Sequence, residues 1–170
     1  MKKLLKSIPF LILFLTSGFA FGGNFEIPKN YKFNTPEDYA TYEPQILECI
    51  NWLSKLKLDQ WQDKRVEAEK FLMAWVEGNP KFKVELNPNI MTFTETNPTL
   101  KAIFVGGWVK YALANPLDMS DLKGNVAGLK AVCKYYETEV NLNRDKNIEH
   151  LAKLRDKGEL KKHVKEQLKA

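Results

Sequence analysis

The sequence predicts an all-α protein, built as an irregular bundle of five to six helices in a single domain. Apolar residues recur at helical spacing through most of the chain. Four of the eight prolines follow an asparagine, a pair that ends one helix and starts the next. The chain has 170 residues, 44% of them hydrophobic, which suffices to bury one core without disulfide support.

Two amphipathic helices are expected first. One begins at Thr35 or at Glu43, each followed by proline, and carries a single apolar stripe to about Leu56. The next occupies residues 62–77, and Gly78 ends it. Because each helix has one apolar face, each must pack against another element.

The segment 81–96 has two interpretations. Apolar and charged residues alternate over Lys81–Leu86, which indicates a short extended segment. We expect a short helix to follow from Pro88, since Asn87 is a suitable cap. The alternative is a β-hairpin in which residues 91–94 form the second strand.

A nearly uninterrupted apolar helix is expected over residues 98–114, behind an Asn97 cap, and should be the central, mostly buried one. The following helix runs from a Ser120 cap to about Val140, with apolar residues at alternating spacings of four and three. Two amphipathic helices with narrower apolar stripes, separated by Gly158, complete the chain.

The first twenty residues have the pattern of a signal peptide. Three lysines precede the apolar run Ile8–Leu15, and Gly18 and Ala20 supply the small residues that a signal peptidase reads. The apolar run is shorter than the roughly 18–20 residues that a membrane anchor needs. We therefore expect cleavage near Phe21, no stable membrane span after cleavage, and a periplasmic or secreted protein.

The predicted organisation is a signal peptide (1–20), an extended lead (21–34), a helical core domain (35–143) and basic amphipathic C-terminal helices (144–170). The leader contains three of the formal +5 charges, and residues 144–170 carry nine Lys or Arg against five Asp or Glu. With only three arginines in the chain, no dense basic face is expected, which excludes nucleic acid as a partner.

Glycines and aromatic residues supply the candidate ligand cleft. Gly106 and Gly107 lie inside the apolar helix 98–114, so one face of that helix lacks side chains. Close helix packing is the favoured interpretation, and a cleft lined by Trp108 and Tyr111 is the alternative. Trp61 is a further candidate because it falls between two helices and off any apolar stripe.

Cys49 and Cys133 are the only cysteines, and both fall on apolar stripes. The sequence is compatible with a disulfide between them and with two buried thiols. A disulfide would close a long loop and contribute about 4 kcal/mol by the chain-entropy relation.

No catalytic residue, metal site or cofactor is predicted. Outside the leader the only serines are Ser54 and Ser120, and neither lies in a Gly-x-Ser-x-Gly motif. His150 and His163 are the only histidines, and both belong to the basic C-terminal segment. A metal site formed by His163 and Glu166 with Glu159 or His150 is the weaker alternative to a solvated surface.

Four stretches resemble a family of small exported helical proteins of Bacteroidota-type bacteria that has no assigned function. They are Cys49–Leu53, Phe71–Pro80, Lys110–Asn115 and Lys157–Leu160. The resemblance covers nearly all of the chain after the leader. It implies export and a helical fold, and it implies no catalytic residues.

These observations favour a non-enzymatic binding or interaction protein, whose ligand is another protein or a small apolar or aromatic-stacking molecule. The alternative is a periplasmic immunity- or chaperone-like protein. An enzyme of undetected mechanism ranks third, because serine and histidine nucleophile motifs are missing.

Overall fold

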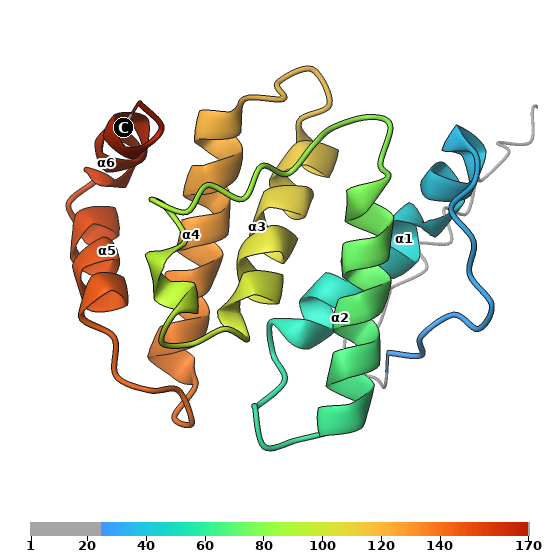
Figure 1. Cartoon of the computed structure of the whole chain (residues 1–170), viewed down its shortest axis with the longest axis horizontal. Helices are drawn as coiled ribbons and strands as arrows, with labels where there is room; N and C mark the ends of the chain where they lie inside the picture. The colour runs from blue at the N-terminus through green and yellow to red at the C-terminus, as the bar shows by residue number, and fades with distance from the viewer. Residues whose placement is uncertain (1–24, 170) are drawn as a thin grey trace, which may run out of the picture.

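The computed structural model describes residues 25–169. Over this range the chain forms six α-helices and one short 3-10 helix, without β-strands, which confirms the all-α class. In Figure 1, α3 and α4 lie side by side at the centre, with α1 and α2 on one side and α5 and α6 on the other. The predicted signal peptide lies outside the described residues. The elements are α1 (Pro36–Leu53), α2 (Gln62–Glu77), η1 (Thr92–Thr94), α3 (Leu100–Ala114), α4 (Asp121–Thr138), α5 (Lys146–Asp156) and α6 (Leu160–Gln167).

The beginning of α1 is fixed by a capping box at Thr35, the first of the two expected starts. The Thr35 side chain accepts the Asp38 backbone N–H at 3.3 Å, and the Asp38 carboxylate accepts the Thr35 N–H at 3.0 Å. Backbone N–H groups of Asn34 and Thr35 lower the pKa of Asp38. Glu43 therefore lies inside α1, and Pro44 is accommodated within the helix.

Residues 81–96 contain no strand, so the hairpin alternative is wrong, and residues 82–87 form an unpaired segment. Asn87 caps a single turn over residues 88–90, where its side chain accepts the Asn89 backbone N–H at 2.9 Å. The expected short helix does not extend from Pro88, and a 3-10 turn follows at Thr92–Thr94. Side-chain burial explains the path: Phe82 packs 5.9 Å from Trp75, and Phe93 packs 5.9 Å from Phe104, measured between ring centroids. The segment is thus held by two aromatic anchors that bridge α2 and α3.

The start of α3 also differs from the prediction. The helix begins at Leu100 behind Thr99, and Asn97 does not cap it with its side chain. Instead the Asn97 amide donates to the Asn143 carbonyl at 3.0 Å and accepts the Asn143 backbone N–H at 2.9 Å. This reciprocal pair ties the entrance of α3 to the loop between α4 and α5.

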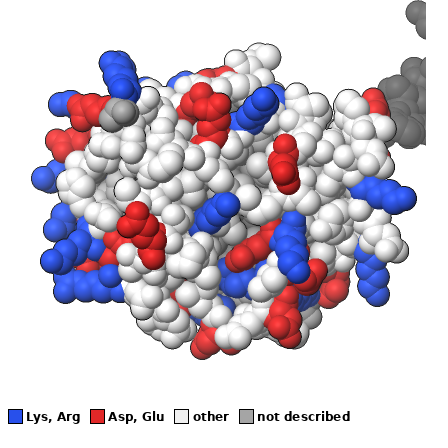
Figure 2. Space-filling view, viewed as in Figure 1, with Lys and Arg blue, Asp and Glu red and all other residues white. Residues whose placement is uncertain are grey.

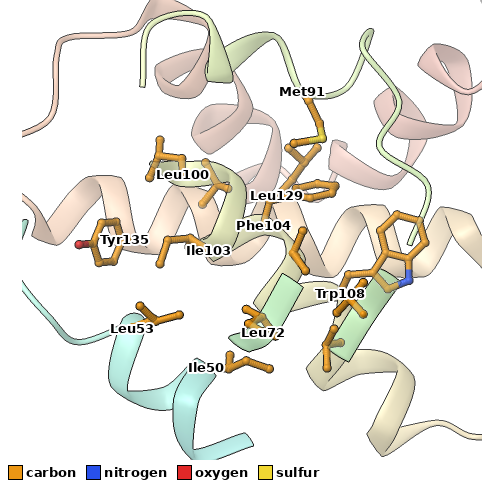
Figure 3. Close-up of a cluster of buried hydrophobic side chains, with 14 of the residues drawn as sticks. Ile50, Leu53, Leu72, Met91, Leu100, Ile103, Phe104, Trp108, Leu129 and Tyr135 are labelled. Atoms are coloured by element: carbon orange, nitrogen blue, oxygen red, sulfur yellow. The ribbon is translucent and has the colours of Figure 1, made fainter. Parts of the chain in front are cut away.

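Helix α3 is the buried centre that its apolar composition predicts. Nine of its fifteen residues are buried, and the surrounding core draws on all the other helices. Figure 3 shows Ile103 and Phe104 of α3 among side chains from α1, α2 and α4. Burial of this many large apolar side chains, each worth roughly 1.5–3 kcal/mol, is the main stabilising contribution.

Glycines let the backbones of α3 and α4 approach closely. A Cβ atom added at Gly107 would lie 2.7 Å from the Ala131 Cβ and 2.8 Å from the Ala127 carbonyl oxygen. A Cβ added at Gly128 would lie 2.7 Å from the Phe104 ring. Both sites are therefore filled by the neighbouring helix, as the packing interpretation predicts.

The lead before α1 covers the outer face of α1 and α2. Phe25 is buried, and the rings of Tyr31 and Phe33 pack against Phe71 at 4.9 and 6.0 Å. The ring of Phe25 also lies 6.1 Å from that of Trp52. This aromatic cluster attaches the lead to α1 and α2.

A buried polar cluster joins the α1–α2 connection to α4. The Arg65 guanidinium donates to the Leu56 carbonyl at 3.0 Å and to the Tyr135 hydroxyl at 2.7 Å, and it pairs with Glu69 at 3.1 Å. Glu139 accepts the Leu58 backbone N–H at 3.1 Å. These contacts satisfy loop groups that would otherwise be buried without partners.

Replacing Gly107 by leucine should destabilise the domain strongly, because the new side chain would meet the α4 backbone. We expect a loss of at least ~3 kcal/mol in the free energy of unfolding, the upper part of the range for overpacking. Urea titration followed by circular dichroism measures it. Lys101→Leu, at an exposed position of the same helix, is the matched control. A Gly107→Leu variant as stable as this control would show that the glycine face is open.

Candidate functional site

A small pocket opens where the irregular segment 82–87 crosses the end of α3. Its volume is about 90 Å³. The segment, the last turns of α3 and the connection from α3 to α4 each contribute part of the wall. The main lining residues are Phe82, Lys83, Glu85, Trp108, Tyr111 and Met119.

The floor of the pocket is rigid because Trp108 is fixed by α4. The indole of Trp108 packs against Gly124 so closely that no Cβ fits there, and the Phe104 ring contacts it edge-on at 6.1 Å. Trp108 is almost fully buried, whereas Tyr111, one turn later, is half-buried at the pocket wall. A helix spacing of three places both side chains on the same side of α3.

Charged groups border the pocket at the α3–α4 connection. Lys123 forms an ion pair with Asp118, and its hydrogen bond lowers the pKa of that carboxyl group. Burial, with the nearby Asp118 charge, raises the pKa of Tyr111. Tyr111 and Asp118 form no hydrogen bond of ordinary geometry. Tyr111 therefore stays protonated at neutral pH, and its hydroxyl oxygen is buried without a hydrogen-bond partner.

The loops that form the pocket also carry exposed apolar side chains. Leu117 is fully exposed, Met119 is 42% exposed, and Leu86 is 37% exposed. These are three of the six large apolar residues that are exposed in the described chain. We call Leu86, Leu117 and Met119 the apolar rim. Met119 lines the pocket, whereas Leu86 and Leu117 lie one and two residues away from lining residues in the sequence.

The structure separates the residues of the predicted ligand cleft. Trp108 and Tyr111 do line a pocket, but Gly106 and Gly107 do not. Gly106 faces Ile50 of α1, where an added Cβ would lie 2.8 Å from the Ile50 side chain, and Gly107 faces α4. The expected cleft along the glycine face is thus occupied by helix packing. Trp61 lies away from this pocket, at the beginning of α2, and is 61% exposed.

Sequence reasoning identified Trp108 and Tyr111 as cleft residues and missed most of the other residues that line the pocket. Phe82, Lys83 and Glu85 belong to the segment 81–86. Its alternating pattern predicted an extended backbone, and no residue of this segment was predicted to bind a ligand. Leu117 and Met119 could have indicated this region from the sequence. They are apolar but lie in a connection marked by Asn115 and Pro116, so they do not belong to the apolar face of any helix.

Both cysteines are buried free thiols in the structure, which is the second of the two alternatives that the sequence left open. Cys49 faces α2, where its thiol donates to the Ala68 carbonyl at 3.4 Å, while Cys133 lies near Arg155 of α5. Burial raises the pKa of Cys49 to about 12 and that of Cys133 to about 11. Neither is a thiolate at neutral pH, so neither serves as a nucleophile.

The C-terminal helices α5 and α6 form a basic surface with a histidine pair. Figure 2 shows the Lys and Arg side chains gathered at the edge where α5 and α6 lie in Figure 1. The rings of His150 and His163 stand edge to face with centroids 6.0 Å apart. Within residues 25–169, no three His, Cys, Asp or Glu side chains come together as a metal-binding group.

Comparisons with known protein families, curated proteins and solved structures found no match to this chain. None of the helices between residues 25 and 169 combines the length and the apolarity needed to cross a membrane. The geometry of the described residues is therefore the basis for the function proposed below.

Stability should fall on mild acidification because of His163. Burial, followed by the charge of His150, lowers the pKa of His163 below its ordinary value of 6.5. Between the two pKa values the unfolded chain binds more protons than the folded one. The contribution of His163 to the free energy of unfolding is therefore fully present above pH 6.5 and is lost as pH falls through the lowered pKa. The free energy of unfolding, measured by urea titration at several pH values, should decline less steeply in His163→Gln. Lys161→Gln, on the same helix, is the control and should keep the wild-type slope. An unchanged slope in His163→Gln would contradict this assignment.

Proposed function

We propose that this protein is a non-enzymatic interaction protein, and that its pocket receives one apolar side chain of a protein partner. The observation that carries the proposal is the position of the apolar rim. Met119 lines the pocket and is 42% exposed, and Leu117, two residues before it, is fully exposed. The nearly buried indole of Trp108 forms part of the same pocket. A rigid floor and an exposed apolar border resemble the pockets that receive anchor residues at protein interfaces.

The size of the pocket favours a side chain over a free ligand. Its volume of about 90 Å³ compares with roughly 300–1,000 Å³ for sites that enclose small molecules. It is also smaller than the ~150 Å³ cavity that holds a benzene ring. A partner's side chain needs less enclosed space, because the rest of its binding surface contacts the rim.

The chemistry of the pocket supports binding over catalysis. Ser120 accepts the backbone N–H of Lys123 at 3.4 Å and caps α4. The raised pKa of Tyr111 keeps its hydroxyl protonated. Neither group is activated as a nucleophile or a base.

Export to the periplasm or beyond is part of the same proposal. It rests on the pattern of residues 1–20, which the structure does not describe, and on the resemblance to exported bacterial helical proteins. A periplasmic immunity- or chaperone-like role is a narrower form of the proposal, because both kinds of protein act by binding another protein.

Photo-crosslinking in the cells that make the protein tests the interaction. With p-benzoylphenylalanine at position 86, we expect one discrete heavier product. Leu117→Asp should abolish it, because a carboxylate would be desolvated at the rim. Val140→Asp is the matched control, since Val140 is 84% exposed and outside the rim. A product that is insensitive to Leu117→Asp would contradict the proposed function.

A further inference from the structure

We propose that a second surface, centred on Trp61, contacts the lipid bilayer while the N-terminal apolar segment holds the unprocessed chain at the membrane. Trp52, Trp61 and Lys64 form this surface, which we call the indole patch. It is independent of the pocket and of the apolar rim. The proposal rests on three observations: the exposure of Trp61, the position of Lys64, and the point where residues 1–24 join the domain.

The first observation is an exposed tryptophan in an unfavourable backbone conformation. Trp61 has φ 49° and ψ 42°, in the left-handed region that glycine and asparagine adopt more readily. It immediately precedes α2, yet its side chain makes no capping hydrogen bond, and it is 61% exposed. Strained residues of this kind cluster at functional positions.

The second observation is the lysine between two indoles. The Lys64 ammonium lies 5.5 Å from the centroid of the Trp52 ring and 5.7 Å from that of Trp61. Lys64 also pairs with Glu26 at 3.3 Å, and its side chain is only 21% exposed. Its methylene chain thus extends along apolar rings while the charge stays paired. Tryptophan beside such a lysine is the combination enriched at membrane–water interfaces.

The third observation is where the N-terminal segment joins the domain. Phe25, the first described residue, packs beside Trp52, and Glu26 contacts Lys64. Figure 1 shows this start of the coloured chain next to the beginning of α2. The residues before Phe25 include the apolar run Ile8–Leu15. The first two described residues thus contact Trp52 and Lys64, two members of the indole patch.

The charges around the patch favour an uncharged lipid surface. Residues 55–63 carry two lysines and two aspartates, and Lys64 is paired with Glu26. With no net charge to attract anionic lipid, the contact depends on the indole, which binds at the headgroup level of zwitterionic bilayers.

The test uses the full chain with vesicles of phosphatidylcholine, some of it spin-labelled near the headgroup. An environment-sensitive dye is attached at Gln62→Cys, beside Trp61. Both native thiols are buried with raised pKa values, so they do not compete for the label under native conditions. Val140→Cys carries the same dye as the control at a site outside the patch. Co-sedimentation reports whether the chain remains on the vesicles.

We expect the dye at position 62 to shift to shorter wavelength and to be quenched by the spin-labelled lipid, while the dye at 140 stays in water. Trp61→Gly should abolish the shift at 62 without releasing the chain from the vesicles. Glycine suits the positive φ, so this variant keeps the fold. A water-like dye at 62, a shift that survives Trp61→Gly, or an equal shift at 140 would each overturn the proposal. Leu117→Asp should leave the result unchanged, which separates this surface from the pocket.

Discussion

The close approach of α3 and α4 is the constraint on which the rest of the structure depends. Gly107 and Gly128 bring the two helices together so tightly that one added methyl group at either position meets the neighbouring helix. Helix α3 has no polar face, so it is stable only where neighbours cover it on all sides. The pair α3–α4 therefore forms the centre, and α1, α2, α5 and α6 bury it from the two sides (Figure 1).

The pocket follows from the same arrangement. Trp108 is fixed because Gly124 leaves room for its indole against α4, and this gives the pocket a rigid floor. The walls are different in kind, since they belong to an irregular segment and to a connection with exposed apolar side chains.

Most of the helices could be predicted from local sequence signals. Contacts between segments that are distant in the sequence could not be predicted in this way. The end of α2 at Gly78 and the buried character of α3 follow from short-range patterns. Asn97 looked like a helix cap, but it pairs with Asn143, which is far away in the sequence. Trp108 and Tyr111 were found because aromatic residues near glycines are conspicuous, while the segment opposite them was placed by the burial of Phe82.

Native-state hydrogen exchange tests the central position of α3 most directly. If α3 is held by α4 and covered by all its neighbours, the amides of residues 103–109 should exchange only through global unfolding, with a free energy equal to that from urea titration. Residues 82–87 and α6, at the periphery, should exchange through smaller openings. Exchange of residues 103–109 at a free energy well below the global value would contradict the account.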